Sequence, residues 1–218
     1  MKKYKGVLFD YDGTLVDTNR LILDSWQAVY KSLWGHEEDE DKILATFGEP
    51  LEYTVKRIFP DHDPEEIMGI YRGYQSQVYR ERIELFPGMG ELARELKRRG
   101  YLLGVVTARL REATIIGLEK FGLDEVMDAL VVCEDTDKHK PDPEPALLCL
   151  EKLGIKPEDA VMVGDSLLDL GCARNAGMPI ALVSWTIALK DKVYSLEGEE
   201  KPDCIMEKAE DLLSFIEE

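Results

Sequence analysis

Short runs of apolar residues recur along the chain, and longer stretches with helical spacing separate them. Continuous apolar runs without polar alternation are typical of strands that are buried on both faces of a sheet. Five such runs lie at 5–9, 101–106, 129–133, 160–163 and 179–183. A shorter run at 203–206 predicts a short edge strand.

The segments between these runs predict helices. The predicted helices lie at 89–100, 110–122, 144–154, 169–177 and 208–218. Gly100, Gly122 and Gly154 stand where three of them should end, and a glycine is the usual residue just beyond a helix. Buried strands that alternate with helices indicate an α/β fold, here a Rossmann-like, doubly wound parallel sheet with helices on both faces.

Residues 18–85 break this rhythm, because they contain no clear strand. Apolar residues at helical spacing mark two long helices, at 20–34 and 63–82, and most of the aromatic positions read as the core of this segment. We therefore predict a small all-helical cap domain at 18–85, inserted after the first strand. The α/β core domain would comprise 1–17 and 86–218, with 86–89 as the return hinge.

The composition and charge of the chain restrict the kinds of molecule that it is expected to bind. The chain has 218 residues and a formal net charge of −17, which disfavours nucleic acid and anionic membranes but does not exclude a small phosphorylated substrate. Four cysteines without a CxxC pair suit a reducing compartment. No apolar run is long enough to span a bilayer, and no signal peptide is evident. We expect a cytoplasmic monomer or weak homodimer.

Polar residues follow the ends of the predicted strands. Asp10 and Asp12 follow the first, Thr107 the second, and Asp165 the fourth, while Lys140 lies in the loop after the third. Each of these residues, taken alone, could instead belong to a polar turn, cap a helix or be a solvated surface charge. Because parallel sheets bind ligands beyond the carboxyl ends of their strands, the whole set predicts one functional site.

The set makes sense as a site for phosphoryl transfer. A carboxylate attacks a phosphate dianion poorly unless a cation reduces the repulsion. Asp10, a backbone carbonyl near Asp12, and Asp165 could hold Mg²⁺, while Lys140 and Thr107 would bind the transferring group. Asp169, four residues after Asp165, could orient Lys140 or reach the metal through water. Asp10 would then attack and Asp12 would move protons.

These stretches resemble a known family. DYDGTL, the VVT strand end, the Lys140–Pro141 pair and GDSLLD are similar to the four motifs of the haloacid dehalogenase superfamily of phosphatases. The helical insert resembles the cap of the phosphoglycolate phosphatase, pyrophosphatase and β-phosphoglucomutase-like branch, and LVDTNRLI looks closest to the pyrophosphatase-like members. The resemblance implies an aspartyl-phosphate at Asp10, acid/base work by Asp12, and Mg²⁺ at Asp10, Asp12 and Asp165.

Two departures from the family pattern are minor. The second motif reads TAR, where many relatives have asparagine or another small polar residue after the threonine. Ala108 therefore offers only a backbone N–H to a phosphate, beside Thr107 and Lys140. VSWT at 183–186 lacks the glycine that often follows this tryptophan.

Several functions remain open at this point. A phosphohydrolase for a small phosphorylated metabolite comes first, with a β-phosphoglucomutase-like phosphomutase second. A non-catalytic phospho-accepting signalling module would need neither an acid at Asp12 nor a cap. For the substrate, Glu49, Arg57 and Arg20 are weak candidates for contacts with the leaving group, since each also reads as a surface charge.

Overall fold

The computed structural model describes residues 3–217, so the last residue of the helix predicted at 208–218 lies outside it. Its centre is a parallel sheet of six strands in the order β5-β4-β1-β6-β7-β8. The strands are β1 (Gly6–Phe9), β4 (Leu102–Val106), β5 (Ala129–Val131), β6 (Ala160–Gly164), β7 (Ile180–Val183) and β8 (Cys204–Met206). All six predicted strands are therefore present.

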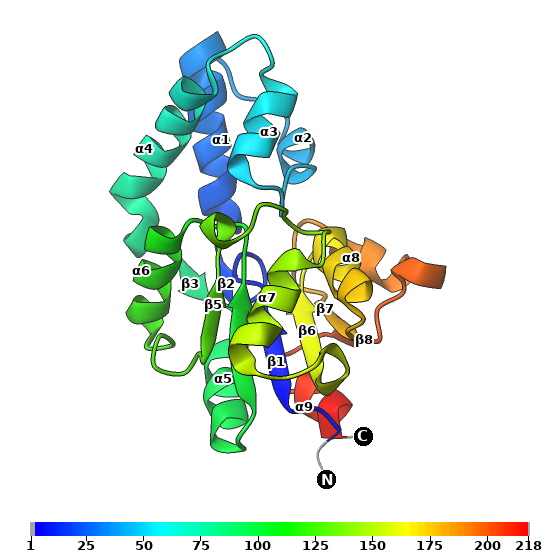
Figure 1. Cartoon of the computed structure of the whole chain (residues 1–218). Coiled ribbons are helices and arrows are strands. Elements are labelled where there is room, and N and C mark those ends of the chain that lie inside the picture. Colours follow the sequence, from blue (N-terminus) through cyan, green and yellow to red (C-terminus); the bar gives the residue numbers. More distant parts are fainter. Residues whose placement is uncertain (1–2, 218) are drawn as a thin grey trace.

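Helices cover both faces of this sheet (Figure 1). They are α5 (Met89–Arg98), α6 (Arg111–Phe121), α7 (Glu144–Leu153), α8 (Leu167–Ala176) and α9 (Asp211–Glu217). Side chains alternate along each strand: Val7 and Phe9 join the apolar cluster that contains residues of α5, α6 and α9, whereas Leu8 joins the one with α7 and α8. The α/β fold is thus confirmed, with two apolar layers.

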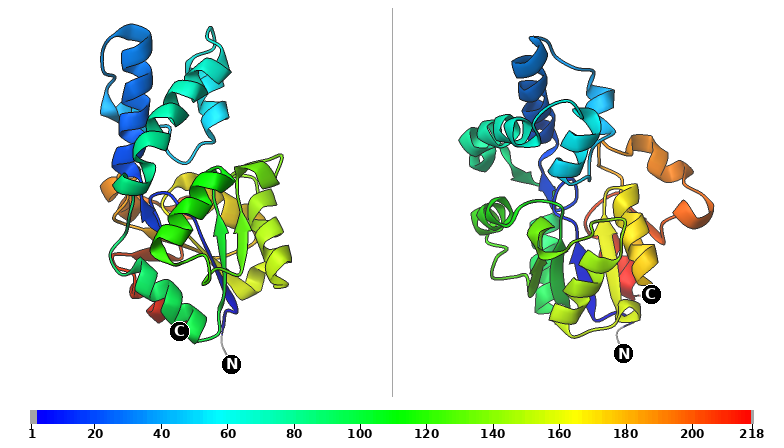
Figure 2. Two further views of the ribbon diagram at one scale, coloured as in Figure 1. Left: turned by 90° about the vertical axis from the view of Figure 1, so that its left-hand side faces the viewer. Right: turned by 45° about the horizontal axis from the view of Figure 1, so that its top comes forward.

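Four helices stand over the carboxyl ends of the strands (Figures 1 and 2), and we call them the cap helices. They are α1 (Asn19–Trp34), α2 (Glu40–Leu44), α3 (Leu51–Ile58) and α4 (Pro64–Arg82). Trp26 packs against Phe59 and Tyr71 inside a separate apolar cluster. Trp26 and Tyr71 therefore lie in a core of the cap helices as predicted, although Tyr71 also borders the cavity described below, whereas Tyr74 packs against the apolar cluster of the sheet instead.

A short antiparallel ribbon joins the cap helices to the sheet. It pairs β2 (Val16–Asp17) with β3 (Glu84–Leu85). These two-residue strands were not predicted, because they are too short to give an alternating pattern. They lie at the boundaries expected for the helical insert, and the division into two domains itself stays a prediction.

The remaining regular segments are short 3₁₀ helices at η1 (Cys133–Asp135), η2 (Pro157–Asp159), η3 (Lys190–Ser195) and η4 (Gly198–Glu200). The run predicted as a strand at 129–133 ends early, since the chain turns into η1 at Cys133. Within residues 3–217, no helix combines the length and the apolar character that crossing a membrane requires.

Candidate active site

The central strands bring three of the predicted residues to one edge of the sheet. β1 lies between β4 and β6, with Phe9 in register with Val105 and Val163. Asp10, Thr107 and Asp165 directly follow these aligned strand ends, and each is buried. The convergence expected from parallel strands is therefore present in the structure.

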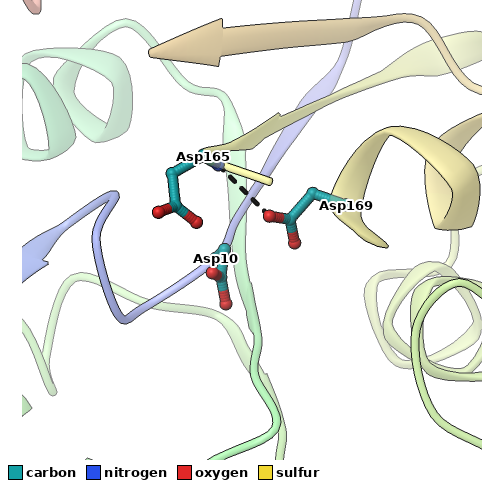
Figure 3. Close-up of side chains that lie close together, drawn as sticks. All are labelled: Asp10, Asp165 and Asp169. Carbon is teal, nitrogen blue, oxygen red and sulfur yellow. Dashed lines mark hydrogen bonds between the residues drawn. The ribbon is translucent and has the colours of Figure 1, made fainter. Parts of the chain in front are cut away.

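Three carboxylates gather at this edge. One oxygen each from Asp10, Asp165 and Asp169 lie within 4.8 Å of one another (Figure 3). Burial and the charge of Asp169 raise the pKa of Asp10 well above its usual value. Burial and Asp169 likewise raise the pKa of Asp165 to about 7. This crowding leaves negative charge that a cation would stabilise.

Lys140 supplies one cation to these carboxylates. Its Nζ lies 2.8 Å from Asp10 Oδ1 and 2.6 Å from Asp169 Oδ1, and its side chain is almost fully buried. Burial alone would lower the pKa of the ammonium, but the charges of Asp10 and Asp169 outweigh it and raise the pKa above its usual value. Lys140 is therefore held as a charged group beside Asp10. We call Asp10, Lys140, Asp165 and Asp169 the Asp10 cluster.

Asp169 is fixed by the start of helix α8. Its Oδ2 accepts hydrogen bonds from the backbone N–H of Asp165 and Ser166 and from the Ser166 hydroxyl, at 3.2, 3.1 and 2.6 Å. Ser166 is the N-cap of α8 and accepts in turn from the Asp169 N–H. With both oxygens engaged, Asp169 is placed to orient Lys140, one of the two roles considered for it.

Asp12 has different surroundings. Arg109 Nε donates to both of its carboxylate oxygens, at 3.0 and 2.9 Å, and Nη2 donates to Oδ1 at 2.8 Å. The Thr18 hydroxyl donates to Oδ1 at 2.6 Å. Gly13 makes the turn at φ 77°, and a Cβ there would lie 2.2 Å from Asp165 Oδ2. We call Asp12, Thr18 and Arg109 the Asp12 cluster.

A cavity of about 810 Å³ lies between these clusters and the cap helices. The predicted residues Asp10, Asp12, Thr107, Ala108 and Lys140 line it from the core side, and Glu49 lines it from the cap side. The structure thus brings both aspartates, the lysine and the threonine to one cavity.

Two of the weak substrate candidates do not line the cavity. Arg20 pairs with Asp24 at 2.9 Å and with Glu40 at 3.1 Å on the exposed side of α1. Arg57 pairs with Glu49 at 2.7 Å. Their side chains are taken up by these carboxylates, and of the three candidates only Glu49 is placed to meet a ligand.

The donor set suits a hard divalent cation. Asp10 and Asp165 are both buried, and each offers a carboxylate oxygen to the group of three that could hold a metal ion. Asp165 Oδ2 accepts from the Thr186 hydroxyl at 2.7 Å, which fixes this carboxylate. Carboxylate oxygens are the ligands that Mg²⁺ prefers, so Asp10 and Asp165 fit such an ion.

Sequence reasoning missed several contacts at the site. Those residues are Thr18, Gln75, Tyr79, Arg109, Ser166 and Thr186. Ser166 could have been found, because a serine three positions before an acid is typical of a helix N-cap. Arg109 stands directly after Ala108, but its pairing with Asp12 depends on the fold.

The fold places the chain in the class of α/β proteins with a parallel sheet and helices over the carboxyl ends of its strands. A family profile for haloacid dehalogenase-like hydrolases matches residues 7–183. Since this span exceeds half of the chain, the protein belongs to that family, and the resemblance inferred from the four motifs is confirmed. The expected hydrolase class is confirmed with it.

Comparisons with individual proteins agree with this assignment. Pyrophosphatase PpaX of Bacillus cereus strain B4264 is 39% identical over 210 residues, which cover 96% of this chain and 95% of that protein. A haloacid dehalogenase-like family hydrolase from Streptococcus pneumoniae superposes with a TM-score of 0.85 at 24% identity, covering 99% of both chains.

A Lactobacillus plantarum protein, provisionally assigned as a phosphoglycolate phosphatase, has a TM-score of 0.82 at 25% identity and covers 98% of this chain and 99% of its own. Both curated and solved relatives therefore match nearly the whole chain rather than the sheet alone.

Proposed function

We propose that the protein is a Mg²⁺-dependent phosphohydrolase that acts on a small phosphorylated metabolite through an aspartyl-phosphate at Asp10, with inorganic pyrophosphate as the first substrate to test. The observation that carries the proposal is Asp10 itself. It is buried, paired with Lys140, directed at the cavity and crowded by other carboxylates. The similarity to PpaX pyrophosphatase supports the choice of substrate.

In the proposed reaction, Lys140, the Thr107 hydroxyl and the Ala108 N–H bind the oxygens of the phosphoryl group that is transferred. One carboxylate oxygen of Asp10 forms a bond to phosphorus as the bond to the leaving oxygen breaks. Asp12 donates a proton to that oxygen and then accepts one from the water that hydrolyses the acyl phosphate. Mg²⁺, held by Asp10, Asp165 and the backbone near Asp12, would reduce the charge repulsion between carboxylate and phosphate.

The cap helices bound the site on the side away from the sheet. A cavity of this volume that closes over a bound substrate would exclude large substrates and bulk water, which would strengthen the interaction of charged groups inside it. We therefore propose that small phosphorylated compounds are substrates and folded phosphoproteins are not. The cytoplasmic location and the monomeric or weakly dimeric state stay predictions.

The test is a panel of phosphate compounds with release of inorganic phosphate as the readout. It should include pyrophosphate, phosphoglycolate, sugar phosphates and an aryl phosphate, each with Mg²⁺ and with excess chelator. We expect release that requires Mg²⁺ and is highest with pyrophosphate. Interconversion of sugar phosphates without release would indicate the phosphomutase instead, and no reaction with any compound would refute the proposal.

A further inference from the structure

The contact between Arg109 and Asp12 is unusual for a residue pair that borders an open cavity. Three hydrogen bonds from one guanidinium hold the carboxylate, yet the Arg109 side chain is only 8% exposed. The pair joins the loop after β4 to the loop after β1, directly at the place where the proposed reaction needs its proton donor. Arg109 has no part in the chemistry assigned so far.

The surroundings of Arg109 fix its position from the cap side. Its guanidinium carbon lies 5.0 Å from the centre of the Tyr79 ring, and Nη1 donates to Gln75 Oε1 at 3.2 Å. Both partners belong to α4. Gln75 and Tyr79 therefore hold the guanidinium of Arg109 at the boundary between the cap helices and the sheet.

Further positive charge lines the same side of the cavity. Arg72 and Arg80 lie on α4, about one turn before and after the region of Gln75, and both line the cavity. Neither takes part in a salt bridge within the described residues. Glu49 and Glu52 line the cap side as well, so these arginines offer local donors to an anion rather than a positively charged surface.

We propose that Arg109 is a specificity residue that binds the departing group when that group is itself a phosphate. In the substrate complex its planar fork would contact oxygens of the second phosphate, and Asp12 would lie beside the bridging oxygen. This inference rests on the proposed phosphohydrolase function. It takes pyrophosphate from that proposal and adds the residue that would favour phosphoanhydrides, whose leaving group is anionic, over esters of neutral alcohols.

The chemistry gives this contact a role in the reaction. When Asp10 forms its bond to phosphorus, the bridging P–O bond breaks and its electron pair stays on the departing phosphate. The negative charge on that phosphate therefore grows in the transition state. A guanidinium that already donates in a bidentate manner to a carboxylate can donate in the same manner to phosphate, and it would stabilise the growing charge.

A simpler role for Arg109 is to position Asp12. The two roles predict opposite substrate dependence. A positioning residue matters most for an alkyl phosphate, whose basic alkoxide needs the proton from Asp12. An anion-binding residue matters most for pyrophosphate. An aryl phosphate, with a weakly basic leaving group and no second phosphate, depends least on either role.

The experiment compares Arg109→Gln, Arg109→Lys and wild type on these three substrates. Arg111→Gln is the matched control, because Arg111 begins α6 and pairs with Asp135 outside the cavity. We expect Arg109→Gln to lower kcat/KM for pyrophosphate by about 100-fold, the value of losing two charge-assisted hydrogen bonds. The aryl phosphate should lose less than about tenfold, and Arg109→Lys should recover part of the pyrophosphate loss only.

Binding gives a second readout that does not depend on turnover. With Mg²⁺ present, Arg109→Gln should weaken the binding of methylenebisphosphonate, measured by calorimetry, and change that of orthophosphate much less. Equal losses for both ligands and for all three substrates would overturn the proposal, as would a loss greatest for the alkyl phosphate. If wild type releases phosphate from none of the substrates, the proposed function fails instead.

Discussion

Asp10 and Asp12 are separated by one residue, yet their surroundings differ in almost every respect. Asp10 is buried among carboxylates and shares a single lysine with Asp169. The Asp12 side chain is 24% exposed and is held by an arginine that the cap helix α4 also contacts. Two neighbouring acids of one turn therefore belong to different parts of the molecule.

The difference follows from where each partner comes from. The partners of Asp10 come from the residue after β6, from the first turn of α8 and from the loop between η1 and α7, all on the sheet side, so the fold fixes them before any ligand binds. Arg109 is contacted from the cap side, so the place of Asp12 depends on how the cap helices meet the sheet. We infer that the Asp10 cluster carries the chemistry common to many substrates, whereas the Asp12 cluster selects among leaving groups.

The strongest test of this division is Asp10→Asn. An amide cannot form the acyl phosphate, so we expect kcat to fall by at least about 10⁴-fold on every substrate, whatever its leaving group. Initial rates of phosphate release, with rapid-quench assay for labelled protein, check this. A folded variant that keeps appreciable turnover on one substrate class would show that Asp10 is not the nucleophile.

Asp12→Asn should give a substrate-dependent loss instead. We expect about 10²–10⁴-fold lower turnover on alkyl phosphates, since general acid catalysis is worth that factor. Aryl phosphates should still transfer their phosphoryl group, and the aspartyl-phosphate should accumulate because no base activates water. A burst of about one equivalent of phenolate, followed by slow turnover, is the expected trace. Equal losses for both leaving groups without a burst would contradict the assignment.

The two aspartates show which parts of the site could be predicted from the sequence and which could not. The strand ends were predictable, because the carboxyl ends of parallel strands share one edge and the apolar runs locate the strands. The Arg109–Asp12 contact was not, since it joins residues 97 positions apart through two loops. Arg20 and Arg57 were only weak candidates, since each also reads as a surface charge. Asp24 stands four residues after Arg20 on the predicted helix, so that pair could be anticipated from the sequence, whereas the Arg57–Glu49 pair depends on how the loop before α3 is placed.

The buried carboxylate of Asp165 should make the stability of the protein depend on pH. In metal-free protein the raised folded pKa of Asp165, about 7, favours the protonated form on folding. Its contribution to stability is therefore present below the unfolded pKa of about 4 and is lost as the pH rises toward 7. The loss should be a few kcal/mol.

Chemical denaturation in excess chelator between pH 4 and 8 measures this effect as the difference between wild type and Asp165→Asn, because the other titrating groups are common to both. We expect the wild-type protein to lose free energy of unfolding relative to the variant as the pH rises. If the free energy of unfolding changes with pH in the same way in wild type and Asp165→Asn, burial does not raise the pKa of Asp165.

The smallest expected effect concerns the tie between the Asp12 side and the cap helices. Tyr79 on α4 shares a buried hydrogen bond of 2.9 Å with Tyr11, while its ring lies beneath Arg109. Tyr79→Phe keeps the ring but leaves the Tyr11 hydroxyl unpaired, which should lower the free energy of unfolding by about 1–2 kcal/mol.

Replacing both tyrosines by phenylalanine removes the orphan hydroxyl, so the double variant should be less destabilised than the sum of the single variants. Tyr53→Phe, at an exposed position of α3, should not change stability. If the double variant instead loses as much free energy of unfolding as the two single variants together, the two hydroxyls do not depend on each other. This hydrogen bond then does not connect α4 to the turn that carries Asp12.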